Sequence, residues 1–400
     1  MMKTSLSLET LARRAFDFFW HETHPQTGLT KDRASHLGKA DSYTVASVAA
    51  TGYALAALPL GVSRGWVKKA DAKQQALRTL RFLSDELVHH HGFFYHFSDW
   101  RNGERVWSCE LSSIDSTLLF LGALAAGRFF GGECAERAEA LVARADWRWM
   151  RNGALAPSMG WKPESGFLEA RWTGYTEASY LYLLALGVPD HPLPQASWDA
   201  LSFTENPAVP AFWAQMTPGY LNLHGLRDRQ GRDWWGIFRR SHEKNIDFCA
   251  QSAEKYRTYR EGIWGITACD QPPPVGYGAQ SPREGDHDGT VAPTAALSGI
   301  LFVPEQANKA LVTLQHRFGD KITGRYGLSN ALNADKSWFD NDVIGIDLGM
   351  ALLSWENSQT GLLWKLVGEH PFLRRGRDVA GFTAARPPQV PSPTAPAAVL

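Results

Sequence analysis

Helical segments of two kinds alternate along this 400-residue chain, and this alternation constrains the fold more than any other feature. Segments 114–130, 178–186 and 346–357 are almost wholly apolar or rich in small residues, whereas segments such as 8–19 and 70–89 are amphipathic. A helix that is apolar all round is buried, and an amphipathic helix covers a core. The pattern, with few strand signals, predicts an all-α fold: an (α/α)6 toroid, or barrel, of alternating inner and outer helices. A helical solenoid would have similar segments, but the sequence has no fixed-period repeat.

A single domain is predicted to occupy residues 1–382. Four hundred residues have room for two average domains or for one large domain of repeated helical hairpins, and the continued alternation favours the second arrangement. After Phe382 the chain turns to Pro and Ala. That composition is typical of disorder, so residues 383–400 are predicted to form a disordered tail.

Charge and cysteine content argue against several classes of protein. The chain has 41 basic and 41 acidic residues, so it lacks the basic footprint of a nucleic-acid-binding protein. We expect no apolar run long enough to span a membrane, and the amphipathic N-terminal segment does not resemble a signal peptide. We therefore expect a cytoplasmic protein, or a periplasmic or secreted one if the N-terminus is truncated. The cysteines lack metal-binding spacing, so we expect neither a metal nor a cofactor; they are Cys109, Cys134, Cys249 and Cys269.

Four of the apolar helical segments have a carboxylate at or just before the first turn: Asp115, Glu177, Asp288 and Asp347. Each alone has an explanation as a cap, because an acid at a helix N-terminus gains about 0.3–1 kcal/mol from the helix dipole. Ser112 and Asp115 even have the spacing of a capping box. Four such acids on the most buried helices suggest a shared purpose, since the inner helices of a toroid begin around one opening. We predict that the four carboxyl groups surround that opening.

Carboxyl groups at such an opening suit the hydrolysis of a glycosidic bond. One must be protonated to donate to the leaving oxygen, and another must be ionised to act on water or on the anomeric carbon. Glu177 has apolar neighbours in Phe167, Trp172 and Tyr175, and desolvation raises the pKa of a carboxyl group, so Glu177 is the predicted general acid. Asp347 lies among polar residues at a helix N-terminus, which favours the ionised form, so it is the predicted base.

Tryptophan is unusually abundant, with 16 residues in the chain, several of them in polar loops that contain glycine. An indole ring presents an apolar face to the C–H face of a sugar, while nearby acids and amides bind its hydroxyl groups. The alternative is that these side chains anchor the loops by packing against the hydrophobic core. On the first interpretation, the predicted substrate-binding residues are Trp161, Glu164, Trp172, Tyr175, Trp264, Asp270, Tyr277, Asp288 and Trp355.

One block, WKPESGFLEARWTGYTEASYLYLLALGVPDHPLP at residues 161–194, resembles the signature of a bacterial glucoamylase-like family. That family includes endo-β-1,2-glucanases and the glucanase-like domain of cyclic β-1,2-glucan synthases. Other blocks similar to the family follow one another in order along most of the chain. They are FDFFWHETHPQTGLTKDR, SVAATGYALAALPLGVSRGWV, ELSSIDSTLLFLGAL, YREGIWGITACDQP, HDGTVAPTAAL, RYGLSNALN and WFDNDVIGIDLGMALLSWENSQTGLLWK.

The resemblance implies an (α/α)6 barrel and a metal-independent hydrolase acting on glucans, β-1,2-linked in the characterised relatives. The proposed catalytic acid of the family, in a W-x-G-Y-x-E motif, falls on Glu177. The resemblance also carries Glu110, Asp115 and Asp347 into the set of catalytic candidates, and a carbohydrate is the implied partner. Two features depart from the family pattern: residues 225–256 are only loosely similar, and GIDLGM lacks the usual Gln and Pro after the Asp.

Other functions stay open at this point. A sugar epimerase on the same barrel needs a pair of His residues as acid and base, and the candidates are His96, His224, His242 and His287. A transglycosylase would use the same carboxyl groups as a hydrolase. A glycan-binding protein could keep the barrel without catalysis, in which case the acids at the helix starts would be caps only.

Overall fold

The computed structural model describes residues 6–37, 42–205 and 207–385. Within them the chain is mainly helical with small two- and three-stranded sheets, as the sequence predicts. Six helices are buried on nearly all sides: α2 (Val48–Ser63), α4 (Ser113–Phe130), α7 (Ser179–Gly187), α9 (Met216–Tyr220), α11 (Pro293–Ser298) and α13 (Gly345–Gln359). Six others have one buried face: α1 (Leu8–His21), α3 (Lys69–Asp85), α5 (Glu133–Ala143), α10 (Trp234–Gln251), α12 (Pro304–Phe318) and α14 (Pro371–Ala380).

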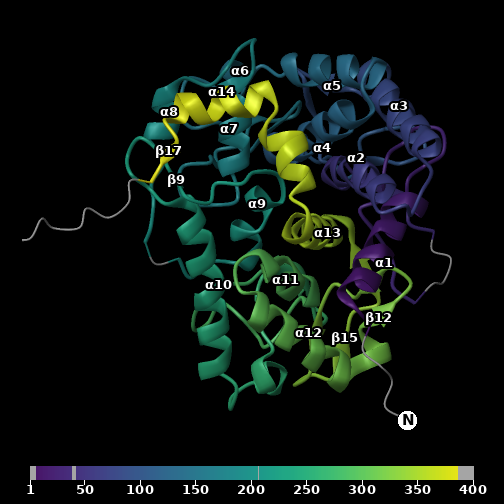
Figure 1. Cartoon of the computed structure of the whole chain (residues 1–400), viewed down its shortest axis with the longest axis vertical. Helices are drawn as coiled ribbons and strands as arrows, with labels where there is room; N and C mark the ends of the chain where they lie inside the picture. The colour runs from purple at the N-terminus through teal and green to yellow at the C-terminus, as the bar shows by residue number, and fades with distance from the viewer. Residues whose placement is uncertain (1–5, 38–41, 206, 386–400) are drawn as a thin grey trace, which may run out of the picture.

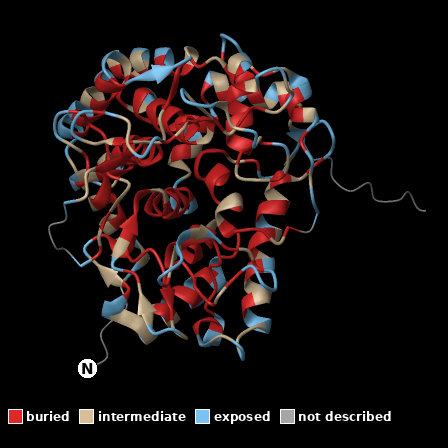
Figure 2. Ribbon diagram, turned by 180° about the vertical axis from the view of Figure 1, so that it is seen from behind, coloured by how far each residue is buried: buried red, intermediate tan, exposed pale blue. Residues whose placement is uncertain are grey.

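The buried helices contact one another in a closed sequence. Contacts run from α2 to α4, α7, α9 and α13 in turn and from α13 back to α2, with α11 against α13. In Figure 1, α13 lies near the middle of the molecule, with α3, α5, α14, α10 and α12 at its periphery. The buried residues in Figure 2 are concentrated on the central helices and the exposed ones on the outer helices and loops. The amphipathic helices thus enclose the apolar ones.

Glycines allow the buried helices α2 and α4 to approach closely. A Cβ atom added at Gly122 would lie 1.9 Å from the carbonyl oxygen of Gly52 on the facing helix. The same helices have clear N-terminal caps, since Ser47 accepts a hydrogen bond from the N–H of Ala50 and Ser112 accepts one from the N–H of Asp115. Such caps satisfy backbone donors that have no partner inside the helix.

Short antiparallel sheets join the loops at one end of the buried helices. β2 (Val45–Ser47), β6 (Leu111–Ser112) and β16 (Asp342–Ile344) run directly into α2, α4 and α13. β16 pairs with β1 (Arg33–Ser35), β2 pairs with β5 (Phe97–Asp99), and β6 continues through β7 (Gly160–Lys162) to β8 (Gly166–Phe167). These pairings bring together loops that are far apart in the sequence.

The remaining elements are short. The other paired strands are β3 (His89–His90) with β4 (Phe93–Phe94), β10 (Ala268–Gln271) with β11 (Gly276–Ala279), β12 (Thr323–Gly324) with β13 (Gly327–Leu328), and β14 (Leu332–Asn333) with β15 (Trp338–Phe339). Two short helices, α6 (Trp147–Arg151) and α8 (Gln195–Asp199), accompany 3-10 turns at Ala211–Ala214, Arg257–Gly262, Gly299–Leu301 and Gly319–Lys321 and a π-helical turn at Trp364–Gly368.

The start of the predicted tail takes part in the fold. Thr383 and Ala384 form β17 (Thr383–Ala384), which pairs with β9 (Leu226–Arg227). The described structure therefore extends past residue 382, where the sequence placed the end of the domain. The rest of the predicted tail from residue 386 onward lies outside the described residues.

One helix has the length and hydropathy of a membrane span, contrary to the sequence-based expectation. It is α4, and 83% of the residues in the apolar window are buried inside the fold. A core helix of this kind meets the same length and hydropathy test as a span.

Candidate functional site

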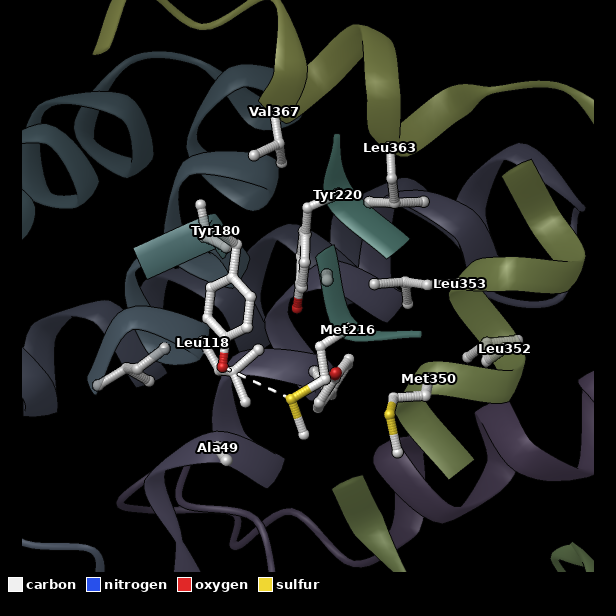
Figure 3. Packing of buried hydrophobic residues seen from close by; sticks show 14 of the residues in the cluster. Ala49, Leu118, Tyr180, Met216, Tyr220, Met350, Leu352, Leu353, Leu363 and Val367 are labelled. Carbon is white, nitrogen blue, oxygen red and sulfur yellow. Dashed lines mark hydrogen bonds between the residues drawn. The ribbon is translucent and has the colours of Figure 1, made fainter. Parts of the chain in front are cut away.

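A cavity of about 720 Å³ opens where the buried helices α4 and α13 begin and where the chain enters α7. Its inner wall is apolar. Figure 3 shows Leu118 of α4, Tyr180 of α7, Met216 of α9 and Met350 of α13 turned toward one another, and all four line the cavity. The hydroxyl group of Tyr180 donates to Sδ of Met216 at 3.6 Å. Several titratable side chains are also part of the lining.

Glu177 faces this cavity from the loop just before α7. Its Oε2 atom is buried and has no hydrogen-bond partner among the described residues. Burial raises the pKa of Glu177 to about 7, and the negative charge of Asp115 adds to the effect. A carboxyl group in such surroundings holds its proton near neutral pH, which is the property of a general acid. The sequence-based argument for a desolvated Glu177 agrees with this geometry.

Asp347 lines the same cavity from the first turn of α13 and is 4% exposed. Asn330 donates to its Oδ2 through Nδ2 at 2.5 Å. Burial nevertheless raises the pKa of Asp347 to about 8, and the carboxylates of Asp32 and Asp270 raise it further. The expectation that the helix N-terminus keeps Asp347 ionised is therefore wrong. A dipole effect of about 0.3–1 kcal/mol is smaller than the cost of an ionised carboxylate that is buried and faces other acids.

Asp115 lies in the first turn of α4 and forms part of a cluster with His96 and Glu110. The Nδ1 atom of His96 is 3.1 Å from Oε1 of Glu110, and its Nε2 atom is 3.5 Å from Oδ2 of Asp115. Burial alone would lower the pKa of His96, but Asp115 and Glu110 together raise it to about 9. The hydrogen bond to His96 in turn lowers the pKa of Glu110. Asp115 and His96 line the cavity, whereas Glu110 supports His96 from behind.

One half of the capping box predicted from Ser112 and Asp115 is present. The Ser112 hydroxyl group accepts from the N–H of Asp115 and donates to its Oδ2 at 2.5 Å. The Asp115 carboxyl group thus bonds the hydroxyl group of the capping residue, whereas a full capping box uses its backbone N–H. Asp115 takes part in the cap and also lines the cavity, so the two explanations offered for the acids are compatible.

A positively charged group that the sequence analysis missed also lines the cavity. Arg33 is paired with Asp270 at 2.8 Å and lies 3.5 Å from carboxylate oxygens of Asp32 and Asp342. Burial opposes its charge, but Asp270 and Asp32 raise the pKa of Arg33 above its usual value. Asp32, whose own pKa is raised by burial, and Tyr43 line the cavity beside it. The only available signal was that Asp32 and Arg33 end one of the blocks that resemble the family.

Two of the predicted substrate-binding residues contribute to the cavity. Tyr277 lines it directly from β11. Asp270, which is opposite Tyr277 in the β10–β11 pair, holds Arg33 in place. The other seven predicted residues lie elsewhere.

The predicted tryptophans belong to the alternative interpretation, in which they fix loops onto the core. Trp161 stacks on His90 with ring centroids 4.6 Å apart. Trp172 is buried and donates through Nε1 to the hydroxyl group of Ser113. Trp264 and Trp355 are also buried, and their contacts are with core residues. An indole satisfies much of its requirement for partners in this way, so the abundance of tryptophan did not by itself identify the ring that lines the cavity.

The remaining predicted residues are engaged in other contacts. Glu164 forms an ion pair with Arg105, and the hydroxyl group of Tyr175 bonds to that of Ser241. Asp288 is paired with Lys336 at 2.9 Å and does not line the main cavity. It also precedes α11 by several residues. Three of the four acids expected around a common opening therefore meet there, and Asp288 does not.

Histidine pairing of the kind an epimerase needs is not formed in the described residues of the cavity. Of the four candidate histidines only His96 is in the lining. His242 is buried in α10, where desolvation lowers its pKa to about 4 and its Nε2 atom contacts the side chain of Gln215. The described residues also contain no group of three or more His, Cys, Asp or Glu placed to hold a metal ion.

Comparison with known proteins relates this cavity to carbohydrate-active proteins. A curated exo β-1,2-glucooligosaccharide sophorohydrolase (non-reducing end) from Parabacteroides distasonis is 24% identical over 92% of this chain. The chain spans 57% of that relative's length.

Solved structures give the same indication. An endo-β-1,2-glucanase from Chitinophaga pinensis, in complex with sophorotriose and glucose, has a TM-score of 0.87 at 25% identity, over 95% of this chain and 99% of that one. A protein from Bacteroides fragilis described as a putative glucoamylase has a TM-score of 0.87 at 27% identity, over 96% of this chain and all of that one. The family model described as "Glycoamylase: Putative glucoamylase" matches residues 169–371, half of the chain including Glu177 and Asp347. The chain therefore belongs to this glucoamylase-like family.

Proposed function

We propose that the protein is a glycoside hydrolase that cleaves β-1,2-linked glucan or its oligosaccharides, on a fold of six helical hairpins arranged as an (α/α)6 toroid. The observation that carries the proposal is Glu177: a buried carboxyl oxygen without a partner, raised in pKa to about 7 and facing a cavity with two further carboxyl groups, Asp115 and Asp347. The names of the relatives support the linkage, since two of them act on β-1,2-glucans or their oligosaccharides. The closed sequence of contacts among buried helices supports the toroid.

In the proposed reaction Glu177 donates its proton to the oxygen of the leaving sugar. The second role requires an ionised carboxyl group, and Asp347 remains the first candidate base. Its pKa of about 8 means that only a fraction of molecules carry Asp347 ionised near neutral pH. Asn330 donates to Asp347 and stabilises that ionised form.

Asp115 is the second candidate for the base. The specific observation in its favour is the raised pKa of His96, whose imidazolium group lies 3.5 Å from the Asp115 carboxylate. The two candidates differ in the pH dependence of catalysis that they imply.

The substrate is tested by incubating the protein with linear β-1,2-glucan and with sophoro-oligosaccharides, and measuring new reducing ends. Parallel reactions with β-1,3- and β-1,4-linked gluco-oligosaccharides test the linkage. We expect reducing ends only from the β-1,2-linked substrates, and products longer than the substrate would instead indicate transglycosylation. Turnover of another linkage with none of β-1,2-glucan would refute the proposed substrate.

A further inference from the structure

Trp107 is the one tryptophan of the described residues that lines the cavity. It lies in the loop between β5 and β6, and it is 63% exposed, which is unusual for so large an apolar side chain. Leu118, Met216 and Met350 on the inner wall are buried, whereas Trp107 is largely exposed, which places it toward the open end of the cavity. An indole exposed to this extent leaves much of its apolar surface uncovered by protein side chains.

The backbone at this position is held in an unfavourable conformation. Trp107 has φ of 54° and Ser108 has φ of 47°, so two successive residues with Cβ atoms adopt the left-handed region. Non-glycine residues occupy that region rarely, and it persists where surrounding contacts determine it. Here the contacts of the loop fix the direction of the indole ring.

Arg105 provides several of these contacts. Its Nη1 and Nη2 atoms donate to both carboxylate oxygens of Glu164, at 2.5 and 3.0 Å, and its Nε atom donates to the carbonyl oxygen of Cys109 at 2.7 Å. The guanidinium group also lies over the ring of Tyr95, 4.6 Å from its centroid. Arg105 thus ties the Trp107 loop to the β7–β8 turn that carries Glu164, and the two-pronged geometry restricts its orientation.

The indole ring is also connected to the catalytic cluster. Trp107 meets the ring of Phe97 edge to face, with centroids 5.1 Å apart, and Phe97 stacks on His96 at 3.8 Å. His96 in turn contacts Asp115 and Glu110. Trp107 therefore has a fixed position relative to the carboxyl groups deeper in the cavity.

We propose that Trp107 is a sugar-binding platform at the mouth of the cavity, and that Arg105 and Glu164 are its positioning residues. The proposal rests on the proposed glucan-hydrolase function and adds a subsite to it. A glucose ring has one largely apolar C–H face, which stacks on an exposed aromatic ring, while its hydroxyl groups stay in water. Because Glu177 lies deeper, the sugar on Trp107 is remote from the bond that is cleaved. The platform therefore favours longer chains and contributes little to the shortest substrate.

Binding to an inactive variant tests the platform without any need for turnover. In the Glu177→Gln background, calorimetry measures the Kd of β-1,2-linked gluco-oligosaccharides from the disaccharide upward. We expect Trp107→Ala to weaken binding of the longest ligands roughly 10-fold, the loss of about one aromatic stacking contact, and that of the disaccharide less than about 2-fold. Trp107→Phe should restore most of the affinity. Equal affinities with and without the indole at every length, or an equal loss at every length, would overturn the proposal.

A double-mutant cycle tests the positioning role of Glu164. We expect Glu164→Gln to weaken binding of long ligands about 3-fold, and to have no further effect when Trp107 is already Ala, because non-additivity measures coupling between two residues. If Glu164→Gln weakens binding of long ligands equally in the Trp107→Ala background, Glu164 does not act through Trp107 and is not one of its positioning residues. Leu155→Ala, at a side chain 47% exposed and outside the cavity, is the control for loss of an exposed apolar group.

Failure of the proposed function is distinguishable from failure of the platform. If the wild-type protein releases no reducing ends from any β-1,2-linked substrate while binding still depends on Trp107 and on chain length, the hydrolase function is refuted and the platform stands. If the wild-type protein does release reducing ends but binding does not depend on Trp107, the hydrolase function stands and the platform is refuted.

Discussion

The carboxyl groups that face the cavity differ in their surroundings, and those surroundings set the roles they are able to take. Glu177 has a buried oxygen without a partner, Asp347 accepts from Asn330, and Asp115 faces His96 and Ser112. The first arrangement favours a held proton, and the third places the carboxyl group beside the imidazolium group of His96. At the scale of single residues, catalysis therefore depends on how protons are distributed among these groups.

Replacement of Glu177 by Gln should lower kcat by roughly 10²–10⁴-fold, the usual contribution of a general acid. The change keeps the shape of the side chain and removes an ionisation that burial disfavours, so the midpoint of thermal unfolding should stay the same or rise slightly. Steady-state kinetics and a thermal melt measure both effects. Glu169→Gln, at an exposed residue outside the cavity, is the matched control. A variant that melts early and keeps its specific activity would show that Glu177 has only a structural role.

The pH dependence of kcat/KM separates the two candidate bases. If Asp347 is the base, activity requires its ionised form, with a pKa of about 8, together with protonated Glu177, with a pKa of about 7. The profile should then be bell-shaped with a maximum between pH 7 and 8, where roughly one molecule in twenty is in the active state. If the base is another group that is already ionised, activity should be constant below pH 7 and fall through that value. A profile without a rising limb near pH 7 would exclude Asp347.

At the scale of secondary structure, the site depends on buried helices that begin close together. α2 and α4 touch at glycines, and a Cβ atom at Gly52 would lie 2.4 Å from the carbonyl oxygen of Leu118. α7 and α14 meet in the same way, since a Cβ atom at Gly187 would lie 1.7 Å from the carbonyl oxygen of Phe372. Such contacts leave no room for even one methyl group, so they hold α4 directly against α2 and α7 directly against α14.

Gly122→Ala tests this close contact. In an open helix the change from Gly to Ala stabilises by about 0.5–1 kcal/mol, but here the new methyl group would lie 1.9 Å from the carbonyl oxygen of Gly52. Overpacking of this kind should reduce the free energy of unfolding by about 3 kcal/mol. Urea unfolding followed by circular dichroism measures the difference. Gly219→Ala in α9, where the nearest atom is Leu353 Cβ at 3.7 Å, should change stability by less than about 1 kcal/mol, and equal effects at both sites would contradict the argument.

At the scale of the whole molecule, the fold holds protons that the unfolded chain would release. Burial raises the pKa of Asp347 to about 8 and that of Glu177 to about 7, and it also raises the pKa of Asp340, each helped by neighbouring carboxylates. A carboxyl group with a raised pKa in the folded state contributes stability that is fully present below its unfolded pKa of about 4. This contribution is lost as the pH rises through the folded pKa. These groups should therefore destabilise the protein increasingly between about pH 4 and pH 8.

Asp347→Asn should remove the largest of these effects. The variant should be more stable than the wild type by on the order of 2 kcal/mol at pH 9, because no charge is then forced into the core. The difference should vanish below about pH 3, where Asp347 is protonated in both the folded and the unfolded state. Thermal melts across this pH range provide the measurement, with exposed Asp190→Asn as the control for net charge. A difference between variant and wild type that stays constant with pH would show that ionisation of Asp347 is not its cause.

The sequence was most informative about the buried helices and the acids at their starts. Segment 70–89 is predicted to be an amphipathic helix and corresponds to α3 (Lys69–Asp85), and the Ser112 cap of α4 follows from the three-residue spacing to Asp115. These features depend on local patterns. The outer helix α10 (Trp234–Gln251) lies within residues 225–256, where the chain is only loosely similar to the family.

The apolar segments of the chain indicated on their own that α4, α7 and α13 are inside, whereas no pattern identified the short buried helix α9, and the motif around Glu177 indicated the family. The folded structure alone settled that Asp115, Glu177 and Asp347 share a cavity without Asp288, that Arg33 and His96 stand among them, and that Trp107 is the tryptophan at its mouth. The physical reason is that desolvation and charge–charge interactions act through space. Arg33 and Asp270 are 237 positions apart in the chain yet form a hydrogen bond of 2.8 Å. A local sequence pattern does not predict a contact between residues so far apart in the chain.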